Sequence, residues 1–196
     1  MKEKVTRVID KFKLLADNGD AEAQYVLWIM YTKRDYGDSY EAVKYSKMAA
    51  DNGIIEAQRL MGDLYSKGVY DVLEQNYGEA IKYYKMAADS GDAEAQFKLA
   101  ELYDHEYHEY DYSTEKWILK YPQNRRKAFK YYKMAAENGV GYALDIVMRA
   151  YLEKGYYEGF EKYYHIAMNT GDLDIMNSAQ FKCYLMNEKK QKNKRK

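Results

Sequence analysis

The chain has 196 residues, of which 47% are hydrophobic and 32% are charged. This composition excludes a disordered chain and fits one elongated domain or at most two small ones. Lys+Arg and Asp+Glu both number 31, so no overall field directs the chain toward nucleic acid or a membrane surface. Six of the basic residues and no acidic residue lie in 189–196, which leaves 25 basic against 31 acidic residues in 1–188.

Cysteine content and hydropathy indicate the compartment. Cys183 is the single cysteine, which excludes a disulfide framework and a cysteine-rich zinc site. The first residues have no signal-peptide pattern, and the longest apolar run, Tyr25–Tyr31, is too short to span a bilayer. We therefore expect a cytoplasmic protein, although a secreted protein without a leader would have the same features.

The first predicted element is a helix over residues 7–19, RVIDKFKLLADNG, and its pattern recurs along the chain. Three later copies are nearly identical and a fourth is weaker: EAVKYSKMAADNG (41–53), EAIKYYKMAADSG (79–91), KAFKYYKMAAENG (127–139) and GFEKYYHIAMNTG (159–171). The closing glycines of the five copies fall 34, 38, 48 and 32 residues apart. These distances are typical of a solenoid of helix–turn–helix units.

Each copy has the spacing of an amphipathic helix. Ala80, Tyr83 and Ala87 fall on one helical face, while Lys82 and Lys85 fall on the other. A closing glycine supplies the left-handed residue that ends a helix. In three copies an aspartate follows the glycine and is placed to cap the next helix: Asp20, Asp92 and Asp172.

A partner helix is predicted after each hinge, over residues 20–31, 54–65, 92–103 and 140–151. Each has a small residue, an apolar residue four positions later and a tyrosine eight positions later, as in Ala57, Met61 and Tyr65. Small residues let two helices approach closely while the large ones interdigitate. The sequence therefore predicts an all-α solenoid of about five units and roughly ten helices, with the boundaries 1–19 (half unit), 20–53, 54–91, 92–139, 140–171 and 172–188 (half unit).

The unit 92–139 carries an insertion at 104–126 that its siblings lack. It is rich in aromatic residues, which we treat as a candidate interaction loop: Tyr107, Tyr110, Tyr112, Trp117 and Tyr121. His105 and His108 are weak candidates for a metal site, because i, i+3 spacing on a helix would place both imidazoles on one face. We expect instead that the insertion extends the helix, with a binding loop as the second interpretation and no bound metal. After 172–188, the basic segment 189–196 is predicted to be a disordered tail.

The paired pattern resembles the Sel-one-like repeat (SLR) family, a branch of the tetratricopeptide-like superfamily. The unit 54–91 matches best, through Ala57, Met61, Gly62, Leu64, Tyr65, Gly68, Val69, Ala80, Tyr83, Tyr84, Ala87, Ala88 and Gly91. Only Gly62 keeps the glycine between the helices; Trp28, Ala100 and Met148 stand at the equivalent positions. The resemblance implies a right-handed solenoid. One bacterial branch is linked to β-lactam binding or hydrolysis, but its units carry paired cysteines, which this chain lacks.

The resemblance also implies that the first helix of each unit lines a concave groove. The outward positions of these helices are the candidate partner-binding residues: Glu22, Tyr25, Ile29, Arg59, Asp63, Phe97, Glu101, Tyr142, Asp145 and Arg149. Aromatic anchors mixed with charges suit a protein or peptide partner, and the acidic bias suits a basic one.

The expected function is therefore non-enzymatic: an adaptor, scaffold or regulator that binds a protein or peptide, without a cofactor. No phosphate loop or nucleophile–base pair can be assigned. The alternative is a nucleic-acid-associated protein that uses the basic segment 189–196 and exposed tyrosines. An enzyme or metal site built on the insertion 104–126 is a third interpretation.

Overall fold

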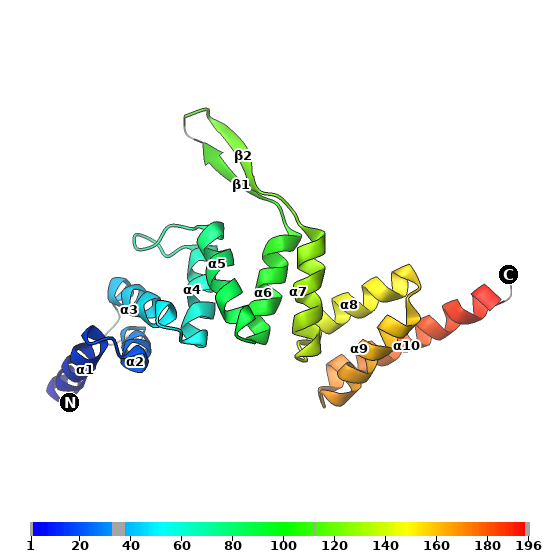
Figure 1. Ribbon diagram of the computed structural model, residues 1–196, viewed down its shortest axis with the longest axis horizontal. Helices are drawn as coiled ribbons and strands as arrows, with labels where there is room; N and C mark the ends of the chain where they lie inside the picture. Colours follow the sequence, from blue (N-terminus) through cyan, green and yellow to red (C-terminus); the bar gives the residue numbers. More distant parts are fainter. Residues whose placement is uncertain (1, 33–37, 112, 195–196) are drawn as a thin grey trace. The chain divides into compact units, whose positions relative to one another are not determined.

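The computed structural model describes residues 2–32, 38–111 and 113–194, which form ten helices and one two-stranded antiparallel sheet (Figure 1). The elements are α1 (Lys2–Asp17), α2 (Ala21–Tyr31), α3 (Ser39–Asp51), α4 (Ile55–Lys67), α5 (Tyr77–Asp89), α6 (Ala93–Asp104), β1 (Tyr107–Asp111), β2 (Lys116–Tyr121), α7 (Arg125–Glu137), α8 (Gly141–Lys154), α9 (Tyr157–Asn169) and α10 (Leu173–Lys194). The predicted all-α repeat fold is confirmed. We call the first helix of each repeat unit an A helix (α2, α4, α6, α8, α10) and the second helix a B helix (α1, α3, α5, α7, α9).

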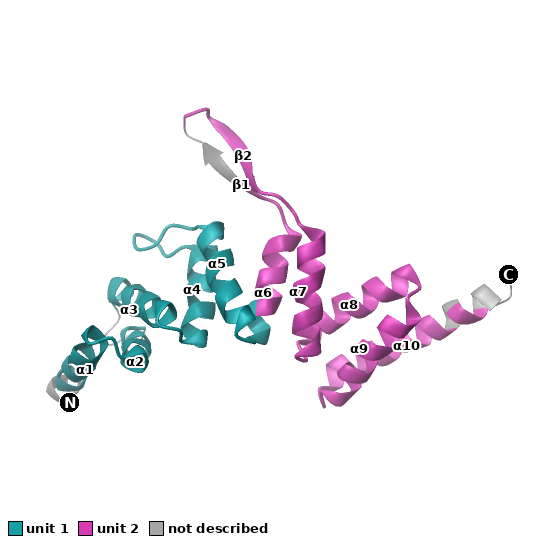
Figure 2. Ribbon diagram, in the orientation of Figure 1, with its two compact units in different colours: residues 1–95 teal, residues 96–196 magenta. Residues whose placement is uncertain are grey.

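The chain divides into two compact units, residues 1–95 and 96–196, which Figure 2 colours separately. In the first unit α2 packs on α1 and α3, and α4 packs on α3 and α5. In the second unit α8 packs on α7 and α9, and α10 packs on both α8 and α9. Each unit therefore has its own core.

The hinges between helices have the predicted chemistry. Gly53 has a φ of 95° and Gly91 a φ of 95°, a left-handed conformation that strains any residue with a Cβ. The carboxylates of Asp20 and Asp92 accept hydrogen bonds of 2.9 and 2.6 Å from the backbone N–H groups of Ala23 and Ala95. These aspartates cap α2 and α6, as their position after the glycine predicts.

The cores contain a repeated pair of tyrosines. A tyrosine near the end of an A helix stacks on a tyrosine in the middle of its own B helix, with ring centroids 5.7–6.0 Å apart: Tyr31 on Tyr45, Tyr65 on Tyr83, Tyr103 on Tyr131 and Tyr151 on Tyr163. A lysine ammonium lies 4.9–5.3 Å from the centroid of each B-helix ring: Lys44, Lys82, Lys130 and Lys162. The four B-helix tyrosines and Tyr31 are buried, as their columns in the repeat predict, whereas Tyr65, Tyr103 and Tyr151 are half-buried.

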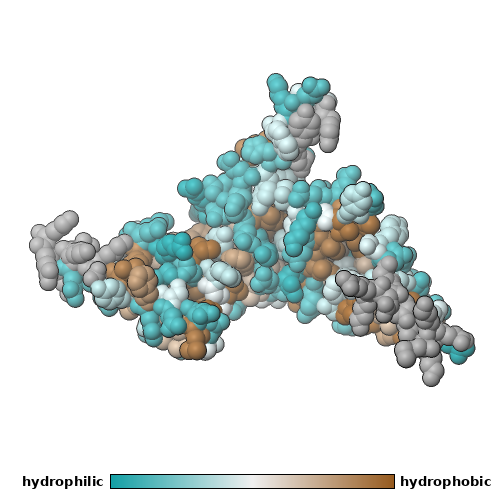
Figure 3. Space-filling view, turned by 180° about the vertical axis from the view of Figure 1, so that it is seen from behind, coloured by the Kyte–Doolittle hydropathy of each residue, from teal (hydrophilic) through white to brown (hydrophobic). Residues whose placement is uncertain are grey.

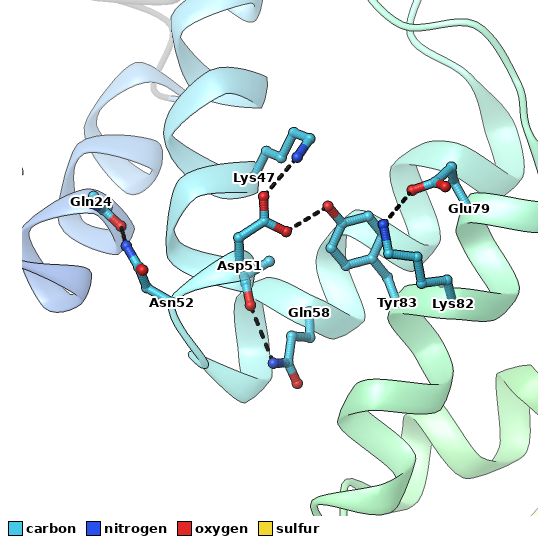
Figure 4. A network of polar contacts seen from close by, with 9 residues as sticks. Gln24, Lys47, Asp51, Asn52, Gln58, Glu79, Lys82 and Tyr83 are labelled. Carbon is cyan, nitrogen blue, oxygen red and sulfur yellow. Dashed lines mark hydrogen bonds and ion pairs between the residues drawn. The ribbon is translucent and has the colours of Figure 1, made fainter. Parts of the chain in front are cut away.

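Polar contacts join successive helix pairs beside these stacks (Figure 4). The Tyr83 hydroxyl donates a 2.8 Å hydrogen bond to Asp51 Oδ1, and Lys47 Nζ lies 2.6 Å from the other oxygen of Asp51. Burial raises the pKa of Tyr83 to about 12, and the hydrogen bond to Asp51 adds to this. The second unit repeats the contact, since Tyr163 donates to Glu137 over 3.1 Å. A buried ring therefore anchors α5 to α3 and α9 to α7.

The insertion 104–126 does not extend the helix, so that prediction is wrong. Helix α6 ends at Asp104, and β1 and β2 form an antiparallel hairpin in which Tyr110 lies opposite Trp117 and His108 opposite Leu119. The segment KWILK is rich in residues that favour strands. Gln123 Nε2 closes the base of the hairpin with a 2.6 Å hydrogen bond to the backbone oxygen of Asp104.

Helix α10 continues through residues 189–194, where the sequence led us to expect a disordered tail. The run contains no glycine or proline that would end a helix. Lys190 holds it against α9, because its ammonium lies 2.8 Å from Glu161 Oε1 and 4.9 Å from the ring centroid of Tyr157.

Candidate functional site

The predicted groove residues of α2 are only partly accessible. Glu22 is exposed and Ile29 is 37% exposed. Tyr25, however, stacks on Trp28 with centroids 5.2 Å apart and packs on the core cluster that contains Met61. Tyr25 therefore serves chiefly to join α2 to the following repeat, which contains α4.

The predicted groove residues of α4 are engaged in contacts within the first unit. Arg59 Nε lies 3.2 Å from Asp92 Oδ2, the carboxylate that caps α6. The hydroxyl of Tyr84 donates a 2.6 Å hydrogen bond to Asp63 Oδ1. Charge reversal at Arg59 would therefore disturb its pairing with Asp92 as well as any bound partner.

Phe97 is not an exposed anchor, so its assignment to the groove surface is wrong. Its side chain is 9% exposed, and its ring lies 5.8 Å from that of Tyr132 and 6.3 Å from that of Tyr142. Phe97 is therefore part of the aromatic packing of α6 on α7 and α8. Glu101, one turn further along α6, pairs with Lys98 at 3.0 Å.

Three predicted residues come together in a groove of about 570 Å³ between α8 and α10. It is lined by Gly141, Tyr142, Asp145, Arg149, Asp172, Asp174, Ile175 and Ser178. Tyr142 is 79% exposed and the Arg149 side chain is 62% exposed, so both present their polar ends at its rim. Ile175 gives the wall an apolar surface.

Asp145 is the polar centre of this groove. Its carboxylate accepts a 2.9 Å hydrogen bond from Ser178 Oγ and ion-pairs with Lys182 of α10 and Arg149 of α8. Burial works against the charged form, but these donors outweigh it and lower the pKa of Asp145. Asp145 is therefore a fixed anion that joins α8 to α10, while Asp172 and Asp174 are exposed and add negative charge at the rim.

Among the candidate loop residues, the hairpin exposes Trp117, which is 69% exposed. Its neighbours Ile118 and Leu119 are 46% and 44% exposed, and every residue from Lys116 to Lys120 is open to solvent. In Figure 3 the hairpin rises at the top as a mostly hydrophilic projection with a small hydrophobic area. Tyr107 and Tyr121 are half-buried at its base. The Tyr110 side chain and all of Tyr112 lie outside the described residues.

The two histidines do not share a helical face. His105 follows the end of α6 and its Nδ1 lies 2.9 Å from the backbone oxygen of Glu101, whereas His108 belongs to β1. The i, i+3 argument for a metal site therefore fails. Among the described residues no group of three histidine, cysteine or carboxylate side chains is placed to hold a metal ion.

Sequence reasoning missed the α10 side of the groove, Ile175, Ser178 and Lys182, because the repeat pattern identifies 172–188 only as a half unit. It also missed Ile118 and Leu119. The aromatic and β-branched residues Tyr107, Tyr110, Trp117 and Ile118 were the available signal for strands.

Comparison with known proteins agrees with the repeat architecture. A family model described as Sel1 repeat matches residues 30–54, 55–92, 93–116 and 117–140. The crystal structure of a Sel1 repeat protein from Oxalobacter formigenes is similar at a TM-score of 0.54 and 27% identity, covering 70% of this chain and 94% of that one. A protective antigen of uropathogenic Escherichia coli strains, which displays an SLR fold, is similar at a TM-score of 0.61 and 22% identity. The match covers 88% of this chain and 34% of the antigen.

No curated protein matches the sequence. Across the part of the chain that the structure describes, no helix is both long enough and apolar enough to cross a membrane.

Proposed function

The chain belongs to the Sel1 repeat family, and we propose that it is a non-enzymatic module that binds a basic, extended peptide segment of a partner protein in the groove between α8 and α10. Sel1 repeats generally mediate protein–protein interaction and act as non-catalytic scaffolds. The observation that carries the proposal is the exposure of Tyr142 and Arg149 at the rim of a groove whose other exposed charges are the carboxylates of Asp172 and Asp174.

The chemistry of the groove suits a short peptide. Tyr142 is a stiff aromatic side chain that loses little entropy when covered, because Phe97 already supports its ring. Asp172 and Asp174 offer carboxylates to a lysine or arginine of the partner. Arg149 would select against a second basic residue close by and pair with a carboxylate of the partner.

The alternative that uses nucleic acid has less support. The B-helix tyrosines of the repeat columns, such as Tyr83 and Tyr131, are buried in ring stacks, where no base can reach them. Lys190 of the basic segment pairs with Glu161. The peptide-binding proposal is therefore the better supported of the two.

A peptide-display selection on the immobilised chain tests the proposal. Binders should be enriched in lysine and arginine, and the doubly substituted Tyr142→Ala/Asp174→Lys chain should lose about tenfold or more in affinity. The control is Tyr70→Ala/Glu74→Lys, because Tyr70 is 92% exposed on a loop of the first unit. Binders without a basic bias, or equal affinity for the two variants, would contradict the proposal. Thermal melting by circular dichroism checks that both variants fold.

A further inference from the structure

Helix α1 exposes a face that other B helices bury. Counted back from the closing glycine, Val8 and Leu15 of α1 correspond to Ala80 and Ala87 of α5. Ala80 and Ala87 are 0% exposed, whereas Val8 is 41% and Leu15 is 46% exposed. Leu14, beside them, is 66% exposed. An apolar stripe with helical spacing is therefore open to solvent on α1.

Helix α10 exposes positions that the other A helices of the second unit bury. Nine residues after the hinge glycine, the other A helices of the second unit bury Ala100 (0% exposed) and Met148 (1% exposed). The same count places Gln180 in α10, where it is exposed, and the next residue, Phe181, is 63% exposed. Tyr184, one turn further, is 59% exposed.

The pair α4–α5 shows what covers each of these faces. The Tyr84 ring of the B helix lies against Gly62 of the A helix so closely that an added Cβ would be 2.5 Å from it. The same tyrosine donates its hydroxyl to Asp63, which corresponds to Phe181 of α10. In a complete helix pair the B helix therefore covers the A-helix positions that α10 leaves open. In the same pair the A helix covers the B-helix positions that α1 leaves open.

We infer that this chain self-associates head to tail, with α10 of one copy packing against α1 of a second copy to complete a helix pair. A second copy is the occupant that fits, because an A helix and a B helix already pack together through the same repeat positions in pairs such as α4–α5. Val8 and Leu15 are larger than the alanines that they replace, and Gln180 is larger than Gly62. The completed pair is therefore spaced more widely than α4–α5, and we expect weak, micromolar association.

The surfaces that meet are different, so the contact is heterologous and can propagate beyond a dimer. This property separates it from a symmetric contact of α10 with α10 or of α1 with α1. It also permits a complementation test with two variants that each keep one surface. Leu15 and Phe181 are the positions to substitute, and because both side chains are exposed, a charge at either one should leave folding unchanged.

Sedimentation velocity of the chain 1–196 from about 5 to about 500 µM provides the test. The unsubstituted chain and the control Tyr70→Glu should form dimers and larger species as concentration rises. Leu15→Glu alone and Phe181→Glu alone should each remain monomeric, while their equimolar mixture should give a one-to-one dimer and nothing larger. A monomeric unsubstituted chain, self-association of either variant alone, or a mixture that stays monomeric would overturn the inference. Peptide binding by Leu15→Glu should be unchanged, so this test fails or succeeds independently of the proposed function.

Discussion

The side-chain nitrogen of Asn52 donates a 2.9 Å hydrogen bond to the side-chain oxygen of Gln24, which is 1% exposed. Gln24 in turn donates to the backbone oxygen of Ala16 over 3.0 Å. The second unit repeats the contact, since Asn138 donates to Gln96 over 2.9 Å. A buried glutamine at the start of an A helix is therefore satisfied by the asparagine that precedes the next hinge glycine.

Ser90→Asn should stabilise the first unit, because Gln58 lacks this partner. Gln58 donates to the backbone oxygen of Ala50 over 3.2 Å, but within the described residues its buried side-chain oxygen has no hydrogen-bond donor. Ser90 stands where Asn52 and Asn138 stand in the other copies and has the same backbone conformation. We expect the free energy of unfolding to rise by about 1 kcal/mol, measured by urea denaturation. Asn52→Ser is the matched control and should lower it by a similar amount; two changes of the same sign would refute the argument.

Gly62→Ala should destabilise the pair α4–α5 by about 1–3 kcal/mol, since the new Cβ would lie 2.5 Å from Cδ1 of Tyr84. Tyr84 is 2% exposed and hydrogen-bonded to Asp63, so its ring has little freedom to move. In a double-mutant cycle Tyr84→Leu should recover part of the loss, because leucine leaves room for the methyl group. Full additivity of the two changes would show that the close contact is not the cause.

The repeat columns explain why the helices could be predicted from sequence alone. Positions such as Ala57, Met61 and Tyr83 recur in several copies, and each recurrence supports the same periodicity. The glycine hinges and Asp20-type caps are local signals that need no tertiary information. Residues that occur in one copy carry no such support, and the hairpin at 107–121 is where the prediction of a helix was wrong.

Replacing residues 106–121 by Gly-Gly should leave the stability of the second unit within about 0.5 kcal/mol of its original value. Residues 116–120 are exposed and Tyr107 and Tyr121 are half-buried, so the excision should uncover little core. The base stays closed, because Asn124 donates its backbone N–H to the Tyr103 oxygen over 2.7 Å and Gln123 still bonds Asp104. Phe97→Ala is the positive control and should cost about 3–5 kcal/mol, since this side chain is buried. A large loss on excision would mean that the hairpin supports the helices.

The groove could be predicted only in part, for a physical reason. Helical spacing places Tyr142, Asp145 and Arg149 on one face of α8, and the structure keeps them together. Spacing does not say which outward positions meet a neighbouring helix. Arg59 and Phe97 satisfy the same rule, yet one pairs with Asp92 and the other is buried beside Tyr132.

Asp51→Asn should remove part of the acid sensitivity of the first unit. Burial of Asp51 opposes its charge, but Lys47 and the Tyr83 hydroxyl outweigh burial and lower its pKa below the ordinary value of an aspartate. A carboxylate with a lowered folded-state pKa stabilises the fold above the unfolded pKa, and this stability is lost as the pH falls from about 4 toward the folded value. The Asp51 side chain is 46% exposed and solvent screens its ion pair, so at pH 7 the substitution should cost less than about 1 kcal/mol. This cost should shrink as the pH falls below about 4.

Asp89→Asn is the matched control for Asp51, because Lys85 and Asp89 form the same i, i+4 pair on the next B helix at 2.7 Å. Both partners are 54% exposed, against 47% and 46% for Lys47 and Asp51, and exposed ion pairs of this kind contribute little to stability. What distinguishes Asp51 is the hydrogen bond from the Tyr83 hydroxyl. Urea unfolding of the three chains between pH 2 and pH 7 should therefore show a pH-dependent difference for Asp51→Asn and a small, constant one for Asp89→Asn. Equal pH profiles for the two variants would mean that the Tyr83 hydroxyl does not set the acid response, and the anchoring role of the buried ring would then be steric.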